Sequence, residues 1–149
     1  MHQYLESPKD TERFGEWLVR LCTDSGLCPV FFQGELGAGK TTLIQAMVRA
    51  LPGSENAEVS SPSFTIVNVY PTEPPVAHFD LYRLQDAALE ESLFEYMVAA
   101  DHLLLVEWSE HLPRGYWPED HIRIKLAFRG EGRSVEVTGS GKCDRIQDF

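Results

Sequence analysis

The stretch 34–42 of this chain, which reads GELGAGKTT, constrains its fold more than any other part of the sequence. It satisfies the G-x-x-x-x-G-K-[ST] pattern of a phosphate-binding loop. A short apolar segment, 29–33, precedes the loop, and a segment with apolar residues at helical spacing, 43–51, follows it. Because a phosphate loop joins a strand to a helix, this context predicts a nucleoside triphosphate site. The alternative, a glycine-rich turn with a surface lysine, explains neither the flanking segments nor the pair of threonines.

The residue types in this loop account for phosphate binding. Glycines tolerate left-handed or crowded backbone conformations, so successive N–H groups can turn inward around a phosphate. Thr41 and Thr42 open a helix whose N-terminus favours anions. Lys40 adds a full positive charge where the β- and γ-phosphates would lie, and the Thr41 hydroxyl is the expected Mg²⁺ ligand. The residues predicted to bind the nucleotide here are Gly37, Ala38, Gly39, Lys40, Thr41 and Thr42.

The length and charge of the chain limit its domain number and the kinds of partner it can bind. With 149 residues, the chain is expected to form a single domain over 1–149. Its 13 Lys and Arg against 23 Asp and Glu give a net charge of −10, which argues against autonomous nucleic-acid binding and favours a basic partner surface. The N-terminus lacks a signal-peptide pattern, and no segment approaches the roughly 20 apolar residues of a membrane span. We therefore expect a cytoplasmic protein.

The cysteines and the C-terminal tail carry little pattern. Cys22, Cys28 and Cys143 are odd in number and lack C-x-x-C spacing, so the sequence suggests neither a disulfide framework nor a zinc site. We expect buried or incidental thiols. The tail 139–149 shows no periodicity, and we expect it to be loose.

Periodicity and turn residues predict the order of the elements. Ser7 and Pro8 mark the start of a helix that ends near Gly26, with Asp10 placed to return a capping hydrogen bond. The later expected elements are a strand at 64–70, a strand at 76–80, a helix at 86–100, a buried strand at 103–107 and a hairpin over 122–137. Together they predict an α/β, P-loop NTPase-like three-layer fold: a central mixed sheet flanked by helices, with a C-terminal edge hairpin.

Two carboxylates could complete the site. A phosphate loop hydrolyses little unless a second element holds magnesium and the attacking water. Asp80 and Glu107 each end an expected strand, where ligands of open α/β sheets bind, so both are candidate catalytic residues together with Lys40. Each could instead merely terminate its strand. Glu107 has the stronger claim because the apolar run 103–106 gives it a Walker-B pattern; it could bind Mg²⁺ or polarise a water, and the sequence leaves open which carboxylate activates water.

Three neighbouring side chains keep alternative roles. His78 would project to the same face of its strand as Asp80, where it could contact a γ-phosphate or the magnesium shell, or be structural. Trp108 could belong to the core or act as a lid. Arg83 could reach phosphate or pair with a nearby acid.

Four motifs occur in order along the chain: the phosphate loop, SPSFT at 61–65, HFDLYRL at 78–84 and VEW at 106–108. In this order they resemble the TsaE (YjeE) family of bacterial ATPases, over about Tyr4 to Val137. The HFDLYR string is far more specific than the loop. The resemblance implies a subunit that binds and hydrolyses ATP with Mg²⁺, weakly alone, and that works with TsaD and TsaB to form N6-threonylcarbamoyladenosine at position 37 of tRNAs reading ANN codons. Another subunit would perform the carbamoyl transfer.

The resemblance also implies roles by position. Lys40 and Thr41 would hold phosphate and magnesium, Glu107 would complete the metal or catalytic shell, and 61–65 would act as a switch-like segment near the γ-phosphate. Asp80 lies in the family's acidic motif.

Around the adenine, the resemblance assigns Ser7 and Thr11, with Arg133 closing over the nucleotide. Glu35 stands where the family commonly has Asp, and Ser63 where it often has Thr; the first keeps the charge and the second the hydroxyl. The segment 90–97 departs from the usual pattern, which puts a partner contact there in doubt.

Two rival functions remain open from the sequence. A small-molecule or nucleotide kinase would need an acceptor pocket and an arginine-bearing lid, but the arginines Arg83, Arg114 and Arg129 are scattered. A regulatory module would bind ATP without hydrolysing it. ATP is preferred over GTP because no N-K-x-D guanine-reading string occurs in the chain.

Overall fold

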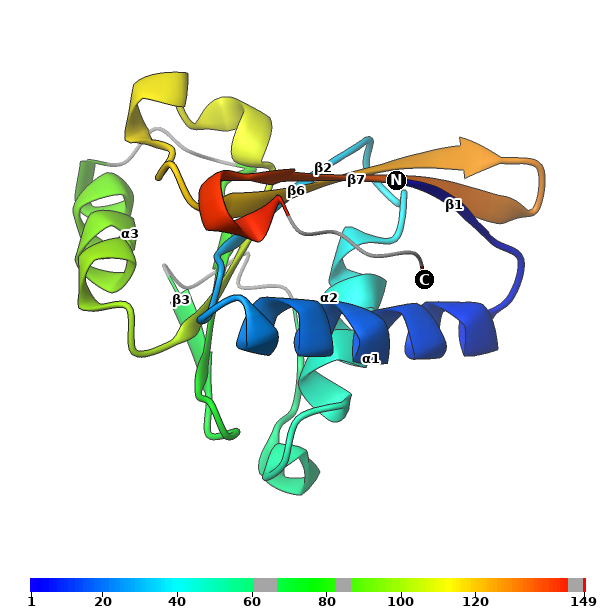
Figure 1. The fold of residues 1–149 in the computed structure, drawn as a ribbon, viewed down its shortest axis with the longest axis horizontal. Helices are drawn as coiled ribbons and strands as arrows, with labels where there is room; N and C mark the ends of the chain where they lie inside the picture. Colours follow the sequence, from blue (N-terminus) through cyan, green and yellow to red (C-terminus); the bar gives the residue numbers. More distant parts are fainter. Residues whose placement is uncertain (61–66, 83–86, 145–148) are drawn as a thin grey trace.

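The computed structural model describes residues 1–60, 67–82, 87–144 and 149 (Figure 1). The strands are β1 (His2–Leu5), β2 (Val30–Gln33), β3 (Val67–Tyr70), β4 (Val76–Asp80), β5 (Leu103–Glu107), β6 (His121–Arg129) and β7 (Gly132–Ser140). The helices are α1 (Pro8–Asp24), α2 (Lys40–Arg49) and α3 (Ala87–Ala99), with short 3-10 turns η1 (Ser54–Asn56), η2 (Ser109–His111), η3 (Arg114–Tyr116) and η4 (Gly141–Cys143).

One mixed sheet organises the described residues. Its strand order is β1-β7-β6-β2-β5-β4-β3. The centre is parallel, because β2 pairs with both β5 and β6 and β4 pairs with β5. The pairs β3–β4, β6–β7 and β1–β7 are antiparallel. The strand that feeds the phosphate loop, β2, therefore has a partner on each side and is held rigidly.

Helices cover both faces of this sheet, as the three-layer prediction requires. Side chains of β2 alternate: Val30 and Phe32 pack with α1 and α2, whereas Phe31 packs with α3 and the segment after β5. The continuous apolar run of β5 is buried on both faces for the same reason. Figure 1 shows α1 and α2 together on one side of the sheet and α3 on the other. The α/β fold with a central mixed sheet is confirmed.

The start of α1 follows the predicted capping pattern. Ser7 is the N-cap, its side chain accepts from the Asp10 backbone N–H at 3.2 Å, and the Asp10 carboxylate accepts from the Ser7 N–H at 3.0 Å. Pro8 occupies the first helical turn, where its missing N–H costs nothing. This reciprocal cap sets where the helix begins and therefore where Ser7 and Thr11 lie.

The hairpin β6–β7 is not at the edge of the sheet, which corrects one detail of the predicted topology. Strand β6 pairs with β2, and β1 covers the outer side of β7 in the register Tyr4↔Ser134. Strand β1 is short and only Leu5 is buried, so its sequence carries no alternation that would reveal it.

The structure also corrects the expectations for the tail and the cysteines. Strand β7 continues to Ser140, and η4 follows it, so residues 139–143 are structured; residues 145–148 lie outside the described ranges. Cys28 and Cys143 form a disulfide across a sequence separation of 115, with Cα atoms 6.4 Å apart. The fold brings Cys28, two residues before β2, beside the end of η4, and spacing rules for local cysteine pairs cannot detect this contact. Cys22 is a buried free thiol whose pKa burial raises to about 12.

Within the described residues, no helix combines the length and the apolar composition needed to cross a membrane.

Close packing between α1 and α2 depends on Gly15. A Cβ at this position would lie 2.8 Å from the Ala46 Cβ and 2.9 Å from the Ala46 carbonyl carbon. We predict that Gly15→Val lowers the free energy of unfolding by about 1–3 kcal/mol, since a packed interface cannot absorb the added methyl groups. Urea denaturation measures this. The matched control is Gly115→Val, because a Cβ at Gly115 meets nothing within 4 Å; equal losses in both variants would contradict the close-packing argument.

Candidate functional site

The loop between β2 and α2 has the backbone geometry of a phosphate loop. Gly34, Gly37 and Gly39 have φ values of +142°, +77° and +103°, which side-chain-bearing residues rarely adopt. A Cβ at Gly34 would also collide with the carbonyl oxygen of Leu126 in β6. Gly39 is the N-cap of α2 and offers no side-chain cap, so the first N–H groups of the helix face the loop's interior.

Lys40 lies over this loop and is only 4% exposed. Its Nζ donates to the carbonyl oxygens of Gly34 at 2.6 Å and Glu35 at 2.9 Å. The same ammonium lies 3.8 Å from the centroid of the Trp108 ring, a cation–π contact. Burial lowers the pKa of Lys40, while neighbouring carboxylates, Glu107 first, oppose that shift. The lysine is thus held at the loop by groups that phosphate oxygens could replace.

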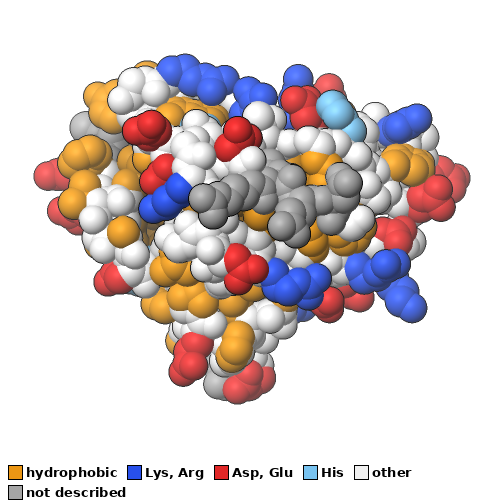
Figure 2. All heavy atoms as spheres, viewed as in Figure 1, with side chains coloured by type: hydrophobic (Ala, Val, Ile, Leu, Met, Phe, Trp, Pro, Cys, Tyr) orange, Lys and Arg blue, Asp and Glu red, His pale blue; other side chains and the backbone are white. Residues whose placement is uncertain are grey.

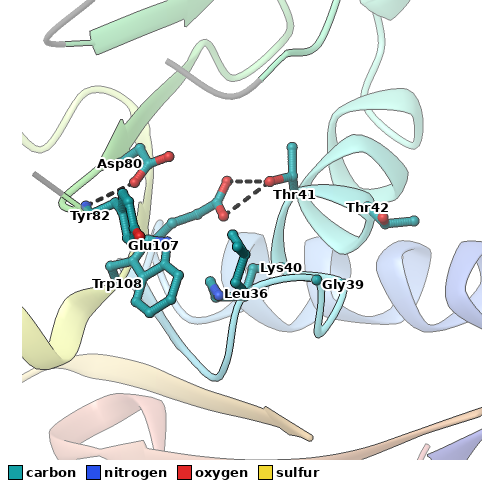
Figure 3. A pocket seen from close by; sticks show the side chains of 10 residues that line it. Leu36, Gly39, Lys40, Thr41, Thr42, Asp80, Tyr82, Glu107 and Trp108 are labelled. Carbon is teal, nitrogen blue, oxygen red and sulfur yellow. Dashed lines mark hydrogen bonds between the residues drawn. The ribbon is translucent and has the colours of Figure 1, made fainter. Parts of the chain in front are cut away.

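Glu107 and Thr41 meet at the mouth of the loop (Figure 3). The Thr41 hydroxyl lies 2.9 Å from Glu107 Oε1 and 3.0 Å from Oε2, so it can donate to either. Glu107 is the last residue of β5 and is 2% exposed. A hydroxyl and a carboxylate are the hard oxygen ligands that Mg²⁺ takes from a protein, with phosphate and water completing its shell. The donor set therefore fits a magnesium ion.

Asp80 faces the same space from β4. It lies opposite Glu107 in the β4–β5 register, and its Oδ1 accepts from the Tyr82 N–H at 2.9 Å. Both carboxylates line a pocket of about 390 Å³. The other residues that line it are Leu36, Gly37, Gly39, Lys40, Thr41, Thr42, Tyr82 and Trp108. The structure thus brings the three proposed catalytic residues into one pocket.

The structure shows where two of the three neighbouring residues with open roles, His78 and Trp108, lie relative to this pocket. His78 is fully buried behind Glu107, with its Nε2 2.9 Å from Glu107 Oε1. Trp108 lines the pocket and is partly buried against the core cluster that includes Phe31 and Leu93, and its role as a lid stays a prediction. Arg83 and the predicted switch segment 61–65 lie outside the described residues.

Ser7, Thr11 and Arg133 line a second pocket of about 200 Å³. It shares Gly39 and Thr42 with the first, so the two pockets meet at the N-terminus of α2. The Arg133 Nε donates to the Ala38 carbonyl at 3.1 Å, which ties β7 to the phosphate loop.

Sequence reasoning missed several residues around these pockets. Leu36 and Tyr82 are 75% and 51% exposed at the mouth of the first pocket, and Phe128 stacks under the Arg133 guanidinium, 4.4 Å from its ring centroid. No pattern marks Phe128, because it belongs to the alternation of an ordinary strand. Tyr82 lies within the HFDLYR string and could have been found from that motif.

Replacing Gly34 tests the loop geometry. Gly34→Ala adds both left-handed strain of about 1–3 kcal/mol and a collision with β6. We predict lower stability and a nucleotide affinity reduced about tenfold or more, equivalent to ~1.4 kcal/mol, measured with a fluorescent triphosphate analogue. Gly26→Ala is the control, because its φ of +79° carries strain but its surroundings are open. Unchanged affinity in Gly34→Ala would contradict the prediction.

The chain is similar in sequence and in fold to several known proteins. A sequence model of the family described as "Threonylcarbamoyl adenosine biosynthesis protein TsaE" matches residues 5–135. A relative from Haemophilus influenzae, named tRNA threonylcarbamoyladenosine biosynthesis protein TsaE, is 35% identical over 128 residues, covering 85% of this chain and 78% of the relative. One of the same name from Aquifex aeolicus is 38% identical over 107 residues, 71% of this chain and 74% of the relative. The crystal structure of Bacillus subtilis YdiB shares the fold, with a TM-score of 0.71 at 22% identity, covering 97% of this chain and 88% of YdiB. The chain belongs to the TsaE family.

Proposed function

We propose that this chain is the ATP-binding and hydrolysing subunit required to form N6-threonylcarbamoyladenosine at position 37 of tRNA, acting with TsaD and TsaB. Its relatives are named for this biosynthesis. The observation that carries the ATPase assignment is the contact between the Thr41 hydroxyl and the Glu107 carboxylate, 2.9 Å apart at the mouth of the phosphate loop. In this contact a carboxylate that could support hydrolysis lies next to the predicted phosphate loop.

Each residue of the first pocket has a role in this proposal. Lys40 would leave the Gly34 and Glu35 carbonyls to neutralise the β- and γ-phosphates. Thr41 and Glu107 would hold Mg²⁺, which neutralises charge that develops on the phosphates. Asp80 and Glu107 are both placed to orient or deprotonate a water, and the proposal leaves open which does so.

The second pocket would receive the base and sugar. It adjoins the first pocket at Gly39 and Thr42 and is bounded by Ser7 and Thr11. Arg133, held at the Ala38 carbonyl, lies where it can close over a bound nucleotide. An ATP molecule would thus span both pockets, with its phosphates at Gly39.

The charge of the chain supports a division of labour with partners. The net charge of −10 is unfavourable for gripping a tRNA backbone. On the face shown in Figure 2, basic side chains lie among acidic ones. We therefore assign the tRNA contact to the partner proteins and stimulated ATP hydrolysis to this chain.

Hydrolysis assays test this function. We predict slow Mg²⁺-dependent ATP hydrolysis by the protein alone and faster hydrolysis with TsaD and TsaB. Glu107→Gln should lower the stimulated rate about 100- to 1000-fold, the usual effect of losing a group that stabilises transition-state charge. Glu136→Gln is the control, since Glu136 lies on β7 away from both main pockets.

Two outcomes would favour other functions. ATP binding with no hydrolysis under any condition would support a regulatory module. Transfer of label from [γ-³²P]ATP to a nucleoside or nucleotide acceptor would support a kinase.

The assignment of the two pockets has its own test. Thr11→Trp would place an indole ring in the second pocket, whose lining does not include Lys40, Thr41 or Glu107. We predict that ATP affinity falls about tenfold or more, ~1.4 kcal/mol, because the indole ring occupies the space proposed for the adenine base. Affinity for inorganic tripolyphosphate should be unchanged. Calorimetric titration measures both ligands, and equal losses for ATP and tripolyphosphate would contradict the assignment.

A further inference from the structure

We propose that His78 is a positioning residue that holds the Glu107 carboxylate in its metal-binding orientation, and that Tyr70 holds His78. This inference rests on the proposed Mg²⁺ site and adds two residues that touch neither the metal nor the nucleotide. His78 and Tyr70 are absent from the lining of both nucleotide pockets. Among the described residues, the contact that links them to the site is the one between His78 and Glu107.

The contact between His78 and Glu107 has one chemical interpretation. His78 Nε2 lies 2.9 Å from Glu107 Oε1, and both side chains are almost completely buried. An ionised carboxylate only accepts hydrogen bonds, so Nε2 must carry the proton. The same Oε1 lies 2.9 Å from the Thr41 hydroxyl. The carboxylate is therefore held between a donor from β4 and a donor from α2, and losing either frees it to rotate.

Tyr70 contacts the other imidazole nitrogen of His78. Its hydroxyl lies 3.2 Å from His78 Nδ1. Burial raises the pKa of Tyr70, so the hydroxyl keeps its proton and can donate to Nδ1. When the hydroxyl donates to Nδ1, the imidazole N–H is the one at Nε2, which faces Glu107. Residues that orient a metal ligand in this way typically affect metal affinity 10- to 100-fold when mutated.

The arrangement extends one contact further. The Tyr70 hydroxyl also lies 3.1 Å from the carbonyl oxygen of Ser60. A hydroxyl has one proton, so it donates either to Ser60 or to His78 at a given moment. The Ser60 carbonyl oxygen and His78 Nδ1 therefore compete for the single proton of the Tyr70 hydroxyl.

Isosteric variants separate positioning from packing. The Gln side-chain nitrogen can replace Nε2 of histidine, whereas that of Asn replaces Nδ1. We compare the wild type with His78→Gln, His78→Asn and Tyr70→Phe. For each, calorimetry gives the affinity for a non-hydrolysable ATP analogue with Mg²⁺ and with EDTA. The ratio of the two affinities is the magnesium enhancement.

We expect His78→Asn to reduce the magnesium enhancement about 10- to 100-fold. His78→Gln should retain it, and Tyr70→Phe should reduce it by about 2- to 10-fold, the effect of one hydrogen bond. Affinity in EDTA should be unchanged in all three.

Three results would overturn this inference: unchanged enhancement in His78→Asn, equal losses in His78→Gln and His78→Asn, or loss of affinity in EDTA, which indicates a packing role. A wild type without any magnesium enhancement would instead refute the proposed metal site itself. The isosteric Tyr70→Phe keeps the inference testable if the His78 variants fold poorly.

Discussion

The hydrogen bond between Thr41 and Glu107 is the interaction on which the candidate site depends. It joins the first turn of α2 to the end of β5, so it links the predicted phosphate loop to the acid. Both ends are rigid: β5 lies between β2 and β4, and α2 packs against α1. A site built from the ends of packed elements holds its geometry better than one built from loops.

Much of this site could be predicted from sequence because its signals are local. The phosphate-loop motif and the apolar run that ends at Glu107 each occupy one short segment, and the fold brings residues of both segments into one pocket. The contacts of His78 could not be predicted in the same way. Its partner Glu107 is 29 residues away, and only the pairing of β4 with β5 in register brings them together.

The fold shows the same division. The capping box at Ser7 and the apolar run of β5 are each encoded by residues close together in the sequence, and α1 and β5 form where these signals predict them. Strand β1 and the Cys28–Cys143 disulfide depend on which strands become neighbours. The pairing of β1 with β7, near the two ends of the chain, depends on the order of strands in the whole sheet. A four-residue strand with one buried side chain carries too little pattern to reveal it.

The same pairing of the chain's ends explains why the second pocket exists. Strand β1 leads into the cap of α1, and β7 lies beside β1, so Ser7 and Arg133 come to opposite sides of the space next to Gly39. The proposed phosphate side of the site is thus built by the parallel centre of the sheet, from β2, β4 and β5. The proposed base side is built by its antiparallel end. A change at Arg133 would therefore reach the loop through the Ala38 carbonyl without disturbing Glu107.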